Sequence, residues 1–240
     1  PAVLTRLGRL TLLDPACGAG SGLVQALQRI ADVRAQLGDP RSVREIRRDA
    51  LTRSVFGVDR NPMAVWLCEL RLWLSVVIES EVADPMAVAP LPNLDRNVRV
   101  GDALLGTPFD AGATLVARPG ELATARRRYA GATGVHKAAL ARALDRAERS
   151  RALTMLDRAI TGVQHARREL VLAGRGPDLF GERRGLTADD RRTLTDLRSR
   201  AAALRHERRR LADGGALPFS FGAHFADVAA DGGFQLIVGN

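Results

Sequence analysis

Apolar residues in the first part of the chain, and at its end, form short continuous runs that alternate with stretches in which they recur every three or four residues. Short runs bounded by acids or glycines are typical of buried strands, and the three-and-four spacing is typical of helices. This alternation indicates an α/β fold with a mostly parallel sheet. The pattern predicts strands over 10–13, 54–59, 97–102 and 233–240 and helices over 20–37, 41–53 and 63–79.

The predicted helix over 63–79 is apolar on nearly every side, so we expect it to be covered by several surfaces, one of them a partner or a missing part of the chain. Residues 218–228 read as a short connector before the last strand. The segment between the third and fourth strands has a different pattern, with helical spacing over 121–172 and 187–212 and a glycine-rich turn between them. It predicts an antiparallel, coiled-coil-like helical hairpin inserted into the α/β core.

This organisation divides the chain into a core of residues 1–117 and 213–240 and a helical insertion of residues 118–212. Charge follows the same division. The formal net charge is +9, yet residues 118–211 hold 23 Arg and Lys against 11 Asp and Glu, so the rest of the chain is slightly acidic. Clustered positive charge binds phosphate backbones by releasing counterions.

Duplex DNA or a partner subunit could therefore bind the insertion, although an Arg-rich solvated helix face explains the charge equally well. Arg is 35 of the 36 basic residues, a bias that a GC-rich coding sequence also explains. The candidate nucleic-acid residues are two arginine triplets in the insertion: Arg126, Arg127, Arg128, Arg208, Arg209 and Arg210.

The remaining composition excludes several classes of protein. No run approaches the ~18 apolar residues of a membrane span, and we expect neither a signal peptide nor a membrane partner. Two cysteines and four scattered histidines offer no metal site and no disulfide framework, which favours a reducing cytoplasm.

A glycine-rich turn follows the first predicted strand. Asp14 closes the strand, Gly18, Gly20 and Gly22 follow, and a helix starts at once. Glycines let backbone and ligand approach closely and adopt positive φ at little cost. Strand, turn and helix in this order open a nucleotide pocket in α/β folds. Because the carboxylate of Asp14 would repel phosphates, the turn suits a ligand with a cationic or amine-bearing end.

Acids also end the second and third strands. A carboxylate at Asp59 can accept hydrogen bonds from both hydroxyls of a ribose, and Asp102 occupies the equivalent place one strand further on. Each could instead be a capping acid at a strand end. With the glycine turn upstream, we favour the ligand interpretation for both.

Four stretches together resemble one enzyme family. Residues 14–20 read DPACGAG, Asn61-Pro62 opens the helix with a Leu-Trp-Leu, residues 101–104 read GDAL, and residues 234–240 end a strand with Gly-Asn. They resemble the motifs of S-adenosylmethionine-dependent N6-adenine DNA methyltransferases from bacterial restriction–modification and phage-defence systems, in particular the large type IIG-like methylases. The resemblance covers about half the chain, and the hairpin is outside the minimal family pattern.

The resemblance implies a Rossmann-like class I methyltransferase core with S-adenosylmethionine as cofactor, double-stranded DNA as substrate and no metal. It implies that Asp14, Ala16, Cys17, Gly18 and Gly20 line the methionine end of the cofactor. It further implies that Asp59, with Asn61 beside it, holds the ribose and that Asp102 accepts a hydrogen bond from the adenine amino group.

Asn240 would be the catalytic residue, as the first position of the family's Asn-Pro-Pro-aromatic motif. The adenine amino group is a poor nucleophile, and an acceptor on its hydrogens would direct its lone pair at the methyl group. The two prolines and the aromatic residue of this motif are absent, as is a recognition domain. We therefore expect the chain to be a fragment cut inside its catalytic motif. Such a fragment would bind the cofactor weakly and would not methylate DNA. Other subunits or the missing C-terminal recognition domain are further candidate partners.

Two rival functions remain open on the sequence. Methylases of RNA or of a protein glutamine amide share Asn-Pro-Pro after the fourth strand. A non-catalytic, basic coiled-coil nucleic-acid-binding or scaffold protein would explain the helical insertion without any cofactor. Binding of S-adenosylmethionine, and its loss on replacing Asp59, separates the scaffold from the enzymes.

Overall fold

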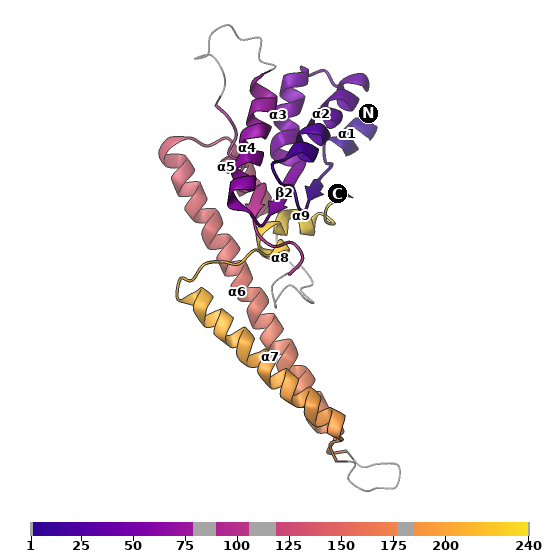
Figure 1. Ribbon diagram of the computed structural model, residues 1–240, viewed down its shortest axis with the longest axis vertical. Helices are drawn as coiled ribbons and strands as arrows, with labels where there is room; N and C mark the ends of the chain where they lie inside the picture. The colour runs from indigo at the N-terminus through magenta and orange to yellow at the C-terminus, as the bar shows by residue number, and fades with distance from the viewer. Residues whose placement is uncertain (1, 79–89, 106–118, 177–184, 240) are drawn as a thin grey trace. The chain divides into compact units, whose positions relative to one another are not determined.

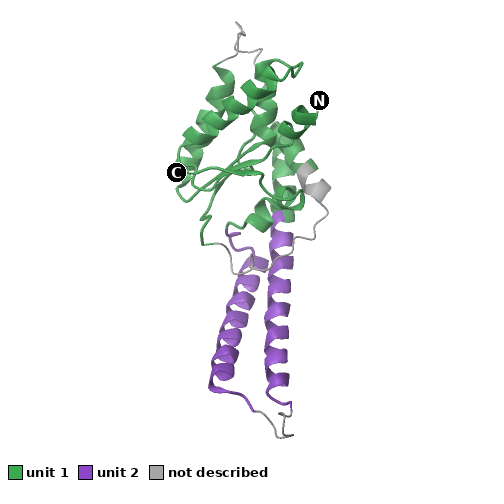
Figure 2. Ribbon diagram, turned by 90° about the vertical axis from the view of Figure 1, so that its right-hand side faces the viewer, with its two compact units in different colours: residues 1–106, 115–147, 219–240 green, residues 107–114, 148–218 purple. Residues whose placement is uncertain are grey.

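The computed structural model describes residues 2–78, 90–105, 119–176 and 185–239 (Figure 1). The chain divides into two compact units, coloured separately in Figure 2. Unit 1 comprises residues 1–106, 115–147 and 219–240, and unit 2 comprises residues 107–114 and 148–218.

Unit 1 contains a sheet of four parallel strands in the order β3-β2-β1-β4. The strands are β1 (Leu12–Asp14), β2 (Val55–Asp59), β3 (Val98–Val100) and β4 (Leu236–Ile237). Leu12 lies opposite Val55 on one side and Leu236 on the other. The mixed α/β class and the parallel sheet are confirmed, and the arrangement is compatible with a Rossmann-like fold. Parallel strands bring all four carboxyl ends to one edge.

One face of the sheet is covered by helices from the first half of the chain. These helices are α2 (Ser21–Gln36), α3 (Val43–Arg53) and α4 (Pro62–Val77). Leu23 and Leu27 of α2 and Leu72 of α4 pack in one buried cluster with Leu12 and Val55 of the strands. Ser42 and Glu45 form a capping box that fixes the start of α3. Helix α1 (Ala2–Leu7) packs against α2.

The other face of the sheet is covered by residues 218–230, most of which the sequence analysis interprets as a connector. That reading is wrong, because the segment folds into α8 (Phe221–His224) and α9 (Ala226–Ala230) and is largely buried. Phe225 packs edge-on against Phe56 of β2, with ring centroids 5.6 Å apart. Helices this short show no hydrophobic period, so only the aromatic residues signal their burial.

The predicted helix over 121–172 is interrupted. The structure has α5 (Pro119–Ala130), then a turn at residues 131–133, then α6 (Gly134–Ala173). Gly134 has a φ of 56°, a conformation that favours glycine. Helix α5 belongs to unit 1, where Arg126 forms an ion pair with Asp227 of α9. The first part of α6, up to Ala147, belongs to the same unit.

Unit 2 is built from the rest of α6 and from α7 (Ala188–Ala212), which lie side by side in both views (Figures 1 and 2). Leu156 of α6 and Leu204 and Leu211 of α7 are fully buried. Arg208 pairs with Asp157 across the two helices, and Arg149 donates hydrogen bonds to the carbonyls of Leu211 and Gly215. None of the described helices combines the length and apolarity needed to cross a membrane.

Candidate functional site

Three carboxylates lie at the carboxyl edge of the sheet, on three adjacent strands. Asp14 is the last residue of β1 and Asp59 is the last of β2. Asp102 follows β3 by two residues, and the strand register pairs Asp59 with Val100. Because the strand order is β3-β2-β1, the three acids stand next to one another along this edge. Ligands of open α/β sheets bind at this edge.

The glycine turn after β1 has the backbone that glycine favours. Gly18 has a φ of 51° and Gly20 a φ of 81°. A Cβ on Gly20 would lie 2.5 Å from Sγ of Cys68, so the turn packs tightly against α4 there. A Cβ on Gly18 would meet nothing within 4 Å. Gly20 supports the fold, whereas Gly18 borders open space.

Asp59 joins the turn to the second strand. Its Oδ2 accepts a hydrogen bond of 2.9 Å from the backbone N–H of Gly18, and its Oδ1 accepts one of 2.8 Å from that of Asn61. A carboxylate has about four acceptor positions. Two are therefore left after these bonds, enough for the two hydroxyls of a ribose.

Asp102 is held by its own loop. Its Oδ1 accepts hydrogen bonds of 2.9 Å from the N–H groups of Leu104 and Leu105, and its Oδ2 lies 3.2 Å from Nε of Arg60. These backbone hydrogen bonds, with Arg60 adding to them, lower the pKa of Asp102 below its usual value. The group is therefore ionised at neutral pH and can accept a hydrogen bond from a ligand amine at Oδ2.

Asp14 differs from the other two acids because it is buried. Burial raises its pKa, a hydrogen bond from the N–H of Ala16 opposes the rise, and repulsion by Asp59 adds to it. A cationic group brought close to Asp14 would stabilise its ionised form.

A pocket of about 450 Å³ lies against this edge, within the range of small-molecule sites. Asp59 and Asp102 line it, as does the exposed Ala16. The sequence analysis missed Arg60, Leu104 and Leu105 as lining residues, although each lies within three residues of a predicted acid. The other lining residues are Pro15, Gly101 and Ala103.

Two predicted cofactor residues have structural roles. Cys17 is buried in the core, and its hydrogen bond with Cys68 raises the pKa of its thiol. Its backbone groups are also engaged, because its N–H donates to the carbonyl of Val58 and its carbonyl accepts from the N–H of Gly20. The side chain of Asn61 accepts a hydrogen bond of 3.0 Å from the N–H of Met63 and so caps α4.

The fourth strand continues the edge toward Asn240. The N–H of Val238 donates a hydrogen bond to Leu13 of β1, which keeps the chain parallel to β1 beyond Ile237. Asn240 itself lies outside the described residues. Its catalytic role remains a prediction.

The six candidate nucleic-acid arginines fall into two groups. Arg126 is buried, and its guanidinium donates to Asp227 and to the carbonyls of Arg96 and His224. Arg208 and Arg210 form ion pairs inside unit 2, with Asp157 and Glu207. The exposed remainder is Arg127, Arg128 and Arg209. In the part of the chain that the structure describes, no group of three His, Cys, Asp or Glu residues could hold a metal ion.

Comparison with known proteins finds a partial match. Over 110 residues the chain is 31% identical to a protein of Methanocaldococcus jannaschii named as a putative type II restriction enzyme and methyltransferase. The match covers 44% of this chain and 9% of that relative's length. No protein-family profile and no solved structure matches the chain. The match supports an origin among restriction–modification methyltransferases.

Proposed function

We propose that unit 1 binds S-adenosylmethionine and belongs to a DNA methyltransferase of a restriction–modification or phage-defence system. One observation carries the proposal: the glycine turn and the acids of three adjacent strands share the carboxyl edge of a parallel sheet, and two of the acids line one pocket. The partial match to a restriction enzyme and methyltransferase supports the same class.

The residues of the pocket, with Asp14 and Gly18 of the adjoining strand end and turn, fit this cofactor. The free acceptor positions of Asp59 suit the ribose hydroxyls, and the open space beside Gly18 admits a ligand close to the backbone. The buried carboxylate of Asp14 suits the positive ammonium end, and the exposed side chains of Leu104 and Leu105 offer an apolar surface for a base. S-adenosylmethionine supplies a methyl group on a positively charged sulfur.

The finer proposal is that the methyl group goes to N6 of adenine in duplex DNA. Support comes from the DPACGAG and Gly-Asn stretches at the ends of β1 and β4. The side-chain oxygen of Asn240 accepts a hydrogen bond from the adenine amino group and so directs the nitrogen lone pair at the methyl group. In this step the sulfur–methyl bond would break as the nitrogen–methyl bond forms, S-adenosylhomocysteine would leave, and the methylated nitrogen would then release a proton to water. Position and hydrogen bonding therefore suffice without a titrating base.

Isothermal titration tests cofactor binding directly. S-adenosylmethionine is titrated into the chain, into Asp59→Asn and into Asp32→Asn, an exposed acid of α2 that serves as control. We expect the Kd to rise at least tenfold, about 1.4 kcal/mol, for Asp59→Asn and to stay unchanged for Asp32→Asn. Absence of binding by the unaltered chain would overturn the proposal and favour a non-catalytic scaffold.

The adenine assignment has a separate test. We expect the reading frame beyond Asn240 to encode Pro-Pro and then an aromatic residue, which would stack on a flipped base. Any other continuation, including a stop codon, contradicts the adenine assignment and leaves cofactor binding unaffected.

A further inference from the structure

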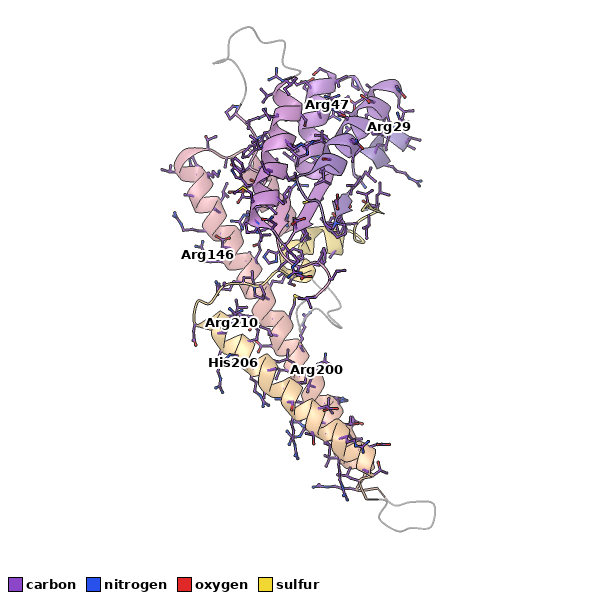
Figure 3. All side chains as sticks on the ribbon, viewed as in Figure 1. Arg29, Arg47, Arg146, Arg200, His206 and Arg210 are labelled. Carbon is purple, nitrogen blue, oxygen red and sulfur yellow. The ribbon has the colours of Figure 1, made fainter. Side chains whose placement is uncertain are left out.

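Unit 2 contains a groove whose charged lining is entirely positive. The groove has a volume of about 540 Å³ and is lined by Arg167, Arg168 and Arg175 of α6 and the residues following it, and by Arg205 of α7. Gln164, Val171 and Leu172 complete the lining, and no Asp or Glu lines it. Figure 3 labels two further arginines of this unit, Arg200 and Arg210, on α7.

These four arginines differ from three ion-paired arginines of the same unit. Arg192, Arg208 and Arg210 each form an ion pair with an acid of the unit. Among the described residues, the side chains of the four groove arginines form no ion pair and no hydrogen bond, and all four are exposed. Oε1 of the nearby Glu169 lies 3.8 Å from Nε2 of His165, and Glu169 does not line the groove. The groove therefore has positive charge that no described carboxylate neutralises.

The spacing of the groove suits a linear polyanion. From Gln164 to Arg175 the helix and its final turn advance by about 16 Å. Duplex DNA carries one charge per ~1.7 Å of its axis, so several phosphates fall within this length. Arginine binds phosphate oxygens through two parallel N–H donors. The side chains of Val171 and Leu172 are apolar and do not compete for these N–H donors.

We propose that this groove binds the phosphate backbone of duplex DNA, through Arg167, Arg168, Arg175 and Arg205. The choice of DNA rests on the proposed function, whereas the affinity for a polyanion follows from the groove itself. These residues are distinct from the arginine triplets at 126–128 and 208–210. Binding of this kind is independent of base sequence and weakens steeply with salt.

The test compares two triple variants of the full chain with equal change in charge. The groove variant carries Arg167→Gln, Arg168→Gln and Arg205→Gln, and the control carries Arg192→Gln, Arg208→Gln and Arg210→Gln. Binding to a fluorescent 30-base-pair duplex is measured by anisotropy from about 50 to 200 mM salt, the range over which phosphate contacts dominate. Circular dichroism verifies that both variants keep the helix content of the parent.

We expect the groove variant to lose at least tenfold in affinity at the lowest salt. The slope of log K against log salt should decrease in magnitude by about 2 to 3, close to 0.9 for each phosphate contact. The control should lose less than threefold. Equal losses of affinity in the two variants, or no binding of the duplex by the parent chain, would overturn the proposal that this groove binds DNA.

Two further probes separate the possible partners. Tighter groove-dependent binding of duplex RNA or of polyglutamate than of duplex DNA would reject DNA as the partner. S-adenosylmethionine titrated into the groove variant should bind as it does to the parent. If the groove does not bind DNA, the titration of S-adenosylmethionine is unaffected. If the chain does not bind S-adenosylmethionine, the anisotropy measurement of DNA binding still stands.

Discussion

At the scale of single residues, the two glycines with positive φ in the turn after β1 have different reasons to be glycine. Gly20 has both a left-handed backbone and a close neighbour, since a Cβ would lie 2.5 Å from Sγ and 3.1 Å from Cα of Cys68. Gly18 has the left-handed backbone alone, and the space beside it is open. One glycine is required by packing, whereas the other leaves room for a ligand.

Alanine substitutions distinguish these two roles. Gly20→Ala combines overpacking of ~1–3 kcal/mol with a left-handed penalty of ~1–2 kcal/mol. We expect it to lower the free energy of unfolding by about 2–5 kcal/mol in urea titration. Gly18→Ala should lower it by only about 1–2 kcal/mol, yet weaken binding of S-adenosylmethionine because its methyl group enters the open space. Equal destabilisation by both substitutions would contradict the packing difference.

Glu69 of α4 gives unit 1 a pH dependence. Burial raises its pKa from 4.5 to about 7, repulsion by Asp95 adds to the rise, and Lys137 opposes it. Because the folded state holds the proton more tightly than the unfolded state, the stabilisation is complete below pH 4.5 and is lost as pH rises through about 7.

The variant Glu69→Gln removes this titration. We expect the free energy of unfolding of the parent, measured relative to the variant, to be constant below about pH 4.5, to fall between pH 4.5 and about 7, and to level off above that. His224, whose pKa burial lowers to about 4, titrates in both proteins and cancels in the comparison. Urea titrations at pH steps between 4 and 8 provide the measurement, and a difference that does not vary with pH would contradict it.

At the scale of elements, α4 has two opposite apolar faces. Leu72 is 1% exposed and packs in the core, whereas Leu74 is 44% and Ile78, just after the helix, 77% exposed. Met63, Trp66 and Leu67 are exposed as well. The surface expected to cover the second face is not found among the described residues.

Substitutions on the two faces of α4 should therefore have unequal effects. Leu72→Ala leaves a core cavity and should lower the free energy of unfolding by about 2–5 kcal/mol. Leu74→Gln should change it by no more than about 0.5 kcal/mol, because it alters exposed surface only. Thermal unfolding of both variants checks this, and a large loss from Leu74→Gln would reveal that the second face is covered.

The sequence predicted the elements with a strong period and missed those without one. Val55 to Asp59 and the helix from Pro62 were predicted to within two residues, because runs of this length have a clear pattern. The turn at 131–133 was missed although Gly131 and Gly134 stand at it, and glycine disfavours a helix interior. The burial of Phe225 depends on a contact with Phe56, far away in sequence, and no local pattern carries it.

The site was predictable to a similar degree. Acids and glycines at strand ends point to one edge once the strands are parallel, so Asp14, Asp59 and Asp102 could be foreseen. The capping by Asn61, the burial of Cys17 and the ion pair between Arg60 and Asp102 depend on side-chain packing. Residue identity therefore predicted the place of these acids at the sheet edge, whereas the hydrogen-bond and ion-pair partners of the side chains were not predictable from it; their role in binding a cofactor stays a prediction.

At the scale of the whole molecule, charge and chemistry are divided between the two units. Unit 1 holds the acids of the sheet edge, and unit 2 holds the groove arginines, which form no ion pair with any described carboxylate. A cofactor with a positive sulfur and ammonium suits the first, and a phosphate backbone suits the second. The proposed enzyme would therefore recognise cofactor and DNA with separate parts of the chain.

The most direct test of the central claim is photochemical labelling with S-adenosylmethionine that carries a radioactive methyl group, followed by peptide mapping. We predict label in peptides that contain residues 14–20, 59–61 or 101–105, and its loss when excess unlabelled S-adenosylmethionine competes. Label confined to α6 or α7, or label that the competitor does not reduce, would contradict a cofactor site at the carboxyl edge of the sheet.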